Sequence, residues 1–332
     1  MIPALRRTLN RMRIQYASDI HLEFRGGPFP ALLKPVAPIL VLAGDVGRSD
    51  KPEYSNFLRY CSRNWEHTVV IAGNHEYYND RTKDWYSRFS PHTMKQRIEM
   101  CLGAATEFQN VYFLQQGRKV IDGVAFLGAT LWTDLRDPKD ALTAETRMSD
   151  FHVITENGAA PITAADVNRW HWEDRGWLLR EIAACAEEAR PAVVVTHHLP
   201  SFQLIASRFA GAGRINAAVA SDVEELIRPP VAAWIAGHTH VGVHAHINGV
   251  QVCVNPVGYP SEAPSSTGYC RELFLEISTE LAGGSAGGAA DFRDPMLVAA
   301  SGSLDDAAAN LSSPAPQRRE ARAQSSESVE ML

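Results

Sequence analysis

Several features are missing from the sequence, and each absence excludes a class of protein. Only five cysteines are present and none forms a CxxC pair, which argues against a disulfide framework and against a cysteine zinc site. No run approaches the 20 or so apolar residues that a membrane-spanning helix needs. The first residues, MIPALRRTLNRMR, are basic without an apolar core, which is not typical of a secretion signal, so a cytoplasmic protein is expected.

The charge balance and the absent motifs narrow the choice of function. Lysine and arginine number 32 against 38 acidic residues, so the net charge is −6. That mild acidity disfavours a broad nucleic-acid-binding surface, although a local basic patch remains compatible with it. The sequence contains no GxxxxGK[ST] or HExxH motif, and residues 12–279 contain no GxSxG motif, which leaves the P-loop, zincin and α/β-hydrolase chemistries without support.

Composition divides the 332 residues into three parts. Residues 12–279 carry the apolar patterns of one large folded domain, and residues 1–11 are expected to be an N-terminal extension. Residues 280–332 are rich in Ala, Gly, Ser and Pro, which predicts a low-complexity, disordered tail.

Five short apolar runs within the folded part are each followed at once by Asp, Asn or His. The residues after the runs are Asp19-Ile20-His21, Gly44-Asp45, Gly73-Asn74-His75, His197-His198 and Gly237-His238-Thr239-His240. Helical patterns over Glu53–Arg63, Thr82–Cys101 and Ala164–Ala189 lie between them. Strands alternating with helices indicate an α/β protein with largely parallel strands, in which ligands gather at the carboxyl ends of the strands. The five polar strand ends are therefore expected to meet at one rim.

Imidazole, carboxylate and carboxamide groups without thiolates suit divalent metals such as Mn, Fe, Zn or Co. Asp19 and His21 are two residues apart, as are His238 and His240, so on an extended chain each pair would point to one side. Each of the three GD, GN and GH glycines allows a tight turn or close approach before a candidate ligand. Any one of these residues alone is more often a turn former or a core histidine, but the recurrence at five strand ends favours a metal site.

The five segments, DIH, GDV, GNHE, THH and GHTH, closely resemble the signature of the calcineurin-like metallophosphoesterases, DxH, GD, GNH(E/D), H and GHxH. The resemblance covers residues 12–279 and includes every part of the signature. It implies a four-layer α/β/β/α sandwich, with two mixed β-sheets flanked by helices and a dinuclear metal centre at one edge.

The same resemblance assigns the metal ligands. It implies that Asp19, His21 and His240 hold one metal ion and that Asn74, His197 and His238 hold the other. Asp45 would bridge the two ions. His75 would be the catalytic residue that stabilises charge or protonates the leaving oxygen.

The position three residues after Asp45 separates branches of this family. The protein phosphatases have an aspartate there that supports the catalytic histidine, and the purple acid phosphatases have a tyrosine that binds ferric iron. Arg48 occupies this position, which disfavours both branches and leaves the partner of His75 unidentified. Arg48 is either a contact for substrate phosphate or a solvated loop residue.

Substrate contacts are expected from the long segment between His75 and His197 and from the loop after the last motif. Trp132 could stack on a base or aryl group, and Arg147 could hold a phosphate; core packing and a surface ion pair are the alternatives. His198 is expected to orient other groups or simply to pack, and Tyr259 is a further candidate for contact with substrate.

The predicted function is a metal-dependent phosphoesterase that cleaves a phosphomonoester or phosphodiester by attack of a metal-bridging hydroxide at phosphorus. A small phosphorylated substrate is the expected partner, with no role for a membrane and a less favoured one for nucleic acid. The alternatives are a nuclease of the same fold and a catalytically silent scaffold. A silent scaffold would be expected to lack several ligands, whereas all seven are present together with His75.

Overall fold

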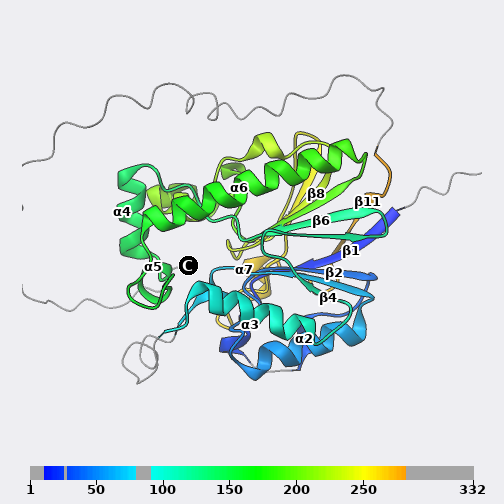
Figure 1. Ribbon diagram of the computed structural model, residues 1–332, viewed down its shortest axis with the longest axis horizontal. Coiled ribbons are helices and arrows are strands. Elements are labelled where there is room, and N and C mark those ends of the chain that lie inside the picture. The colour runs from blue at the N-terminus through cyan, green and yellow to red at the C-terminus, as the bar shows by residue number, and fades with distance from the viewer. Residues whose placement is uncertain (1–10, 26–27, 80–90, 282–332) are drawn as a thin grey trace, which may run out of the picture. The chain divides into compact units, whose positions relative to one another are not determined.

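The computed structural model describes residues 11–25, 28–79 and 91–281, and Figure 1 shows their arrangement. The chain divides into two units, residues 1–284 and 285–332, and all described residues belong to the first. The predicted extension over residues 1–11 and the predicted tail over 280–332 thus fall almost entirely outside the described residues. Arg11, which the sequence places in the extension, already belongs to the first strand.

Two mixed β-sheets form the centre of the domain. The first sheet has the order β11-β1-β2-β3-β4 and the second the order β5-β6-β7-β8-β10-β9. The strands of the first are β1 (Arg11–Ala17), β2 (Ile39–Ala43), β3 (His67–Ile71), β4 (Val111–Phe113) and β11 (Phe274–Ser278). Those of the second are β5 (Gly117–Ile121), β6 (Val124–Ala129), β7 (Ala192–Thr196), β8 (Val231–Ala236), β9 (Val243–Ile247) and β10 (Val250–Val254).

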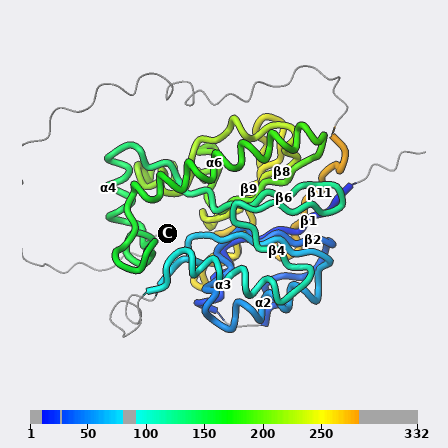
Figure 2. The backbone as a smooth tube through the Cα atoms, in the orientation of Figure 1, coloured from blue at the N-terminus to red at the C-terminus, as the bar shows by residue number. Residues whose placement is uncertain are grey.

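Eight of these strands, β1 to β4 and β6, β7, β8 and β10, pair in parallel, whereas β11, β5 and β9 pair antiparallel at the margins. The chain completes four strands of the first sheet, passes to the second after β4, and returns to pair β11 with β1 (Figure 2). The chain thus crosses between the sheets twice, after β4 and before β11, which are the two outer strands of the first sheet.

Alternation along the central strands builds the layers. In β7, Val193 and Val195 pack between the two sheets, while Val194 packs on the opposite face against Leu178 and Ile182. On the outer face of the first sheet, residues such as Leu42 pack with helices. Because successive strand residues point to opposite faces, continuous apolar strands become buried on both sides. The predicted four-layer α/β/β/α sandwich is confirmed.

Helices cover the outer faces of both sheets (Figure 1). The helices are α1 (Phe29–Leu32), α2 (Pro52–Asn64), α3 (Met94–Thr106), α4 (Pro138–Arg147), α5 (Asp150–Val153), α6 (Ala164–Glu187) and α7 (Pro264–Thr267). Helices α2 and α3 cover the first sheet and α6 covers the second, whereas α4 and α5 extend beyond the strand ends. Among the described residues, no helix is long and apolar enough to cross a lipid bilayer.

The predicted helix over Thr82–Cys101 starts among residues 80–90, which lie outside the described residues, and its bounds are wrong over the part that can be compared. Helix α3 begins at Met94 and continues to Thr106. Thr93 is extended and its hydroxyl accepts from Gln96 N, while the Gln96 side chain accepts from Thr93 N. This reciprocal capping box satisfies two backbone donors and fixes the first turn of the helix.

Candidate metal centre

The polar segments after β1, β2, β3, β7 and β8 come together at the carboxyl ends of the two sheets. Backbone bonds tie their loops: His21 N donates to Asp45 O at 2.9 Å, and Gly237 N donates to His197 O at 2.9 Å. The eight residues that the sequence predicts as ligands or catalytic group are all buried there. They are Asp19, His21, Asp45, Asn74, His75, His197, His238 and His240.

The backbone reaches this arrangement in a way the sequence reasoning did not anticipate. Asp19, His21, His238 and His240 all have φ between 50° and 70°, so the expectation that these pairs lie on extended chain is wrong. Asp45 also has a positive φ, of 52°. Residues with side chains adopt this left-handed region at a cost in free energy that the surrounding structure must offset, and such residues cluster at functional sites.

Asp19, His21 and His240 form the first group of candidate ligands, with one ligand atom from each within 4.8 Å of the others. The Nδ1 atoms of His21 and His240 face the carboxylates of Glu23 at 3.2 Å and Glu262 at 2.6 Å. An Nδ1–H bond to a carboxylate leaves the neutral ring with a lone pair on Nε2. These two Nε2 atoms lie 3.0 Å apart, with lone pairs facing each other.

Asp45, His197 and His238 form a second such group, and Asn74 lies beside it. His197 Nδ1 is 2.9 Å from the Ala43 carbonyl, which can only accept, so in the neutral ring Nε2 carries the lone pair. That Nε2 lies 3.0 Å from Asn74 Oδ1, because the amide nitrogen of Asn74 donates to Asp150 at 2.9 Å. His238 Nε2 is buried with no hydrogen-bond partner among the described residues.

Asp45 lies between the two groups. Its Oδ2 is 3.8 Å from His21 Nε2 on one side and 3.4 Å from His197 Nε2 on the other. Its Oδ1 accepts a hydrogen bond from His75 N at 2.8 Å, which fixes the orientation of the carboxylate. One carboxylate oxygen thus faces lone-pair donors of both groups.

The shifted pKa values of the clustered groups show that their acceptor atoms need positive charge between them. Burial opposes charge on His197, but Asp45 outweighs it and raises the pKa of His197 to about 10. Burial raises the pKa of Asp45, yet His197 and His75 hold it well below its ordinary value. Burial and the neighbouring His198 and His197 instead lower the pKa of His238. Extra protons or bound cations must therefore separate these acceptors, and divalent cations would do so without charging the imidazoles.

Two glycines explain how the loops approach so closely. A Cβ on Gly73 would lie 2.2 Å from Asp45 Oδ1 and 2.6 Å from Asp45 N. Gly44 has a φ of +83°, and a Cβ there would lie 2.5 Å from His197 Nδ1. Any side chain at either position would displace candidate ligands, which is the physical reason for glycine in the GD and GNHE segments.

His75 has a carboxylate partner that sequence reasoning did not identify. Its Nδ1 lies 2.7 Å from Glu23 Oε1, and its ring stacks on Tyr78 at 4.1 Å between centroids. Burial lowers the pKa of His75, but Asp45 and Glu23 outweigh burial and raise that pKa to about 9. With Nδ1 held by Glu23, Nε2 faces the site, 3.9 Å from Asp45 Oδ2 and 3.3 Å from the Tyr259 hydroxyl.

The residues predicted to contact substrate do not all lie at the candidate metal centre. Tyr259 lies at the cluster, with its ring centroid 4.4 Å from that of His21. His198 is buried beside His238, at 4.4 Å between ring centroids, and burial together with His197 lowers its pKa to about 3. Arg48 forms a bidentate ion pair with Asp50, at 2.7 and 3.0 Å. Arg147 is exposed at the end of α4.

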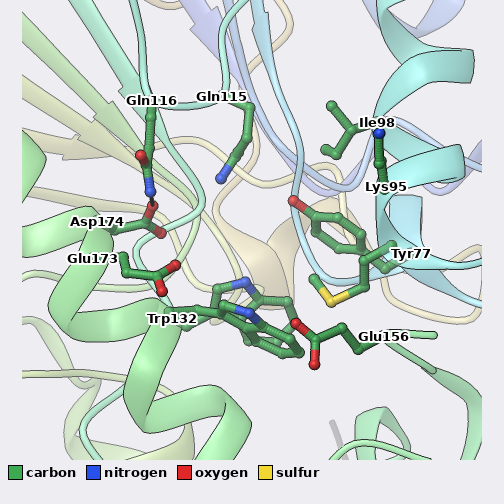
Figure 3. Close-up of a pocket in the computed structure, with 11 residues that line it drawn as sticks. Tyr77, Lys95, Ile98, Gln115, Gln116, Trp132, Glu156, Glu173 and Asp174 are labelled. Carbon is green, nitrogen blue, oxygen red and sulfur yellow. Dashed lines mark hydrogen bonds between the residues drawn. The ribbon is translucent and has the colours of Figure 1, made fainter.

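Trp132 packs in the core, one side-chain layer away from the candidate ligands. Its ring contacts His198 at 5.4 Å and Trp170 at 5.5 Å between centroids. It also lines a pocket of about 230 Å³, where Figure 3 shows it near Gln115 and Asp174. The described residues lining this pocket include no predicted metal ligand. The core-packing alternative therefore describes Trp132 better than contact with substrate at the metal centre.

Three acidic residues complete the site beyond the predicted set: Glu23, Asp150 and Glu262. The sequence held a signal for Glu23, because Glu23 follows His21 at the same two-residue spacing that separates Asp19 from His21. Asp150 and Glu262 offered none, because Asp150, the first residue of α5, follows Asn74 by 76 residues and Glu262 follows His240 by 22. Acidic partners of this kind fix the orientation of ligands and raise the basicity of an imidazole.

The residues present fit two divalent cations. The fit rests on two groups of lone-pair donors, a carboxylate oxygen between them and the orphaned Nε2 of His238. The donor set contains only imidazole nitrogen and oxygen atoms, and metal-ligating histidines of this type usually carry an acceptor on their second nitrogen, as His21, His197 and His240 do here.

Comparison with known proteins gives three findings. Residues 12–242 match the family model described as calcineurin-like phosphoesterase. Uncharacterized protein L509 of Acanthamoeba polyphaga mimivirus is 27% identical over 281 residues, which cover 76% of this chain and 93% of the viral protein. The crystal structure of phosphopantetheinyl hydrolase from Mycobacterium tuberculosis superimposes with a TM-score of 0.57 and 19% identity, over 77% of this chain and 94% of that one. Likeness at that level shows a shared fold.

Proposed function

The chain belongs to the calcineurin-like phosphoesterase family, and from that premise we propose that it hydrolyses phosphomonoesters or phosphodiesters at a two-metal centre. One observation supports the proposal above the others: Asp45 Oδ2 lies between two separate groups of buried lone-pair donors. A single cation would leave one of those groups with its acceptors facing each other.

We propose that Asp19, His21 and His240 hold one cation, that Asn74, His197 and His238 hold the other, and that Asp45 contacts both. Mn, Fe, Zn and Co all suit nitrogen and oxygen donors of this kind. When bound, such a pair supplies positive charge for the phosphoryl oxygens and lowers the pKa of water toward 7.

The protein's own groups supply positioning and proton transfer. His75 Nε2 faces the site because Nδ1 is held by Glu23, so Nε2 is the atom that would donate a proton to the leaving oxygen. Tyr78 stacks on the same ring and its hydroxyl donates to Asp150 at 2.6 Å, which limits rotation of the imidazole. Glu23 is thus a positioning residue for His75.

The test combines metal analysis with a substrate panel. The purified chain, loaded with manganese, is assayed on an aryl phosphate, an aryl phosphodiester and a cyclic nucleotide, with a chelator as control. We expect two equivalents of metal per chain, hydrolysis of at least one ester, and loss of activity with chelator that added metal reverses. One equivalent of metal, or no hydrolysis with Mn, Fe, Zn or Co, would contradict the proposal.

A further inference from the structure

Phe24 is an exposed aromatic residue beside the candidate metal centre. The residue is 57% exposed, and within the described residues it belongs to none of the four hydrophobic clusters of the core. Its ring nevertheless contacts three rings of the site: His21 and His75 at 6.1 Å each, and Tyr259 at 5.7 Å between centroids. An exposed large apolar side chain next to a polar cluster is more informative than one on open surface.

The backbone holds Phe24 in this position. Residues Leu22–Phe24 form a short 3₁₀ turn, in which Phe24 N donates to His21 O at 3.0 Å. Leu22 packs into the core and Glu23 turns to His75, so Phe24 is directed to solvent at the edge of the cluster. The guanidinium of Arg25 then donates to the carbonyl of Gly258, which ties this turn to the loop that carries Tyr259.

Tyr259 borders the same space from the opposite loop. Its ring centroid lies 4.4 Å from that of His21 and 4.5 Å from that of His240, and its hydroxyl is 3.3 Å from His75 Nε2. Gly258 N donates to Asp19 O at 3.0 Å, and Tyr259 N donates to Glu262 at 2.6 Å. The loop is therefore anchored to the segment that supplies Asp19. The rings of Phe24 and Tyr259 meet edge to face, at 71°.

We infer that Phe24 and Tyr259 form an aromatic wall on which a planar ring of the leaving group packs. The inference rests on the proposed phosphoesterase function. His75 Nε2, the atom proposed to face the leaving oxygen, lies against Tyr259, so a ring joined to that oxygen would extend along Tyr259 toward Phe24. Aromatic faces hold planar rings with little dependence on hydrogen bonding. The substrate class is thus a phosphoester of an aryl or nucleoside alcohol rather than of a small acyclic one.

The experiment compares Phe24→Ala with a matched control, Phe274→Ala. Phe274, the first residue of β11, is also exposed, and its ring lies near the guanidinium of Arg13 on β1 rather than near the cluster. Both variants and the parent chain, loaded with manganese, are assayed on phenyl phosphate, adenosine 5′-monophosphate and glycerol 3-phosphate. Calorimetry with phenylphosphonate and methylphosphonate measures binding independently of turnover.

We expect Phe24→Ala to lower kcat/KM about tenfold, mainly by raising KM. The loss should fall on phenyl phosphate if the wall holds the ring of an aryl alcohol, and on adenosine 5′-monophosphate if it holds the ring of a nucleoside. The loss on glycerol 3-phosphate should be less than about twofold, and Phe274→Ala should match the parent on all three. Phe24→Trp should retain the parent's preference for the ring-bearing substrate over glycerol 3-phosphate. Phe24→Ala should weaken the binding of phenylphosphonate and leave the binding of methylphosphonate unchanged.

Equal losses on all three substrates, or none, would overturn the aromatic wall while leaving the phosphoesterase intact. If the parent chain cleaves none of the three, binds neither phosphonate and also fails on the aryl phosphodiester and the cyclic nucleotide, the proposed function fails and the wall fails with it. The two failures are therefore distinguishable by the behaviour of the parent chain.

Discussion

Glu23 Oε1 lies 2.7 Å from Nδ1 of His75 and 3.2 Å from Nδ1 of His21, so one carboxylate contacts both the proposed proton donor and a proposed metal ligand. Arg48, at the position where the protein phosphatases carry the supporting aspartate, instead pairs with Asp50. The support for His75 therefore comes from the loop after β1 rather than from the loop after β2.

Replacing Glu23 by alanine should lower both metal affinity and turnover, but by separable routes. Loss of the partner of His21 should weaken metal binding by about 10- to 100-fold, which excess metal overcomes. Loss of the partner of His75 should leave kcat about 10- to 100-fold down even at saturating metal. Metal titration of kcat measures both effects, and full recovery of kcat by metal would show that Glu23 does not position His75.

Replacing His197 by alanine should reduce metal occupancy and turnover together, by more than about 100-fold in turnover, because it removes a proposed ligand rather than a partner of one. His244→Ala is the matched control, since His244 is exposed on β9. Elemental analysis beside phosphatase assays gives both quantities. Two bound metals and normal turnover in the His197 variant would refute its assignment.

Glu76 holds two of the site's loops together from inside. Its buried carboxylate accepts from Asp45 N, Val46 N, Gly47 N and Gly73 N, at 2.7 to 3.2 Å. Glu76→Ala leaves these donors without partners, and we expect it to lower the free energy of unfolding by at least about 3 kcal/mol. Denaturant unfolding measures the loss, with the exposed Glu66→Ala as control. A change below about 1 kcal/mol would contradict this role.

Asp174 gives a prediction for the pH dependence of stability. Burial raises its pKa from 3.8 to about 6, although bonds from Gln116 and Leu131 N oppose the shift. The folded state thus binds the proton more tightly, so this stabilisation is complete below the unfolded pKa and is lost as pH rises through 6. Asparagine does not titrate, so Asp174→Asn lacks this loss. The difference in free energy of unfolding between Asp174→Asn and the parent should therefore shift in favour of the variant by up to about 3 kcal/mol from pH 4 to pH 7. Urea unfolding across that range tests it, and a difference that does not vary with pH would contradict it.

Local patterns predicted the elements that depend on local physics. The run Ile39–Ala43 was read correctly as a buried strand, because continuous apolar sequence suits a strand covered on both faces. The start of α3 could also have been read, from Thr93 and Gln96 at capping-box spacing. The left-handed backbone of Asp19 and His21 could not have been predicted from the sequence. Neither residue type requires a positive φ, and only the packed loops impose it.

The sequence by itself determined the fold class and the kinds of side chain at the strand ends, since burial patterns and donor chemistry are properties of short segments. Only the tertiary structure decided which groups touch: Glu23 on His75, Glu262 on His240, Phe24 beside Tyr259, and Trp132 directed into a separate pocket. These pairings join loops far apart along the chain, and their geometry follows from how two twisted sheets pack, which no local segment encodes.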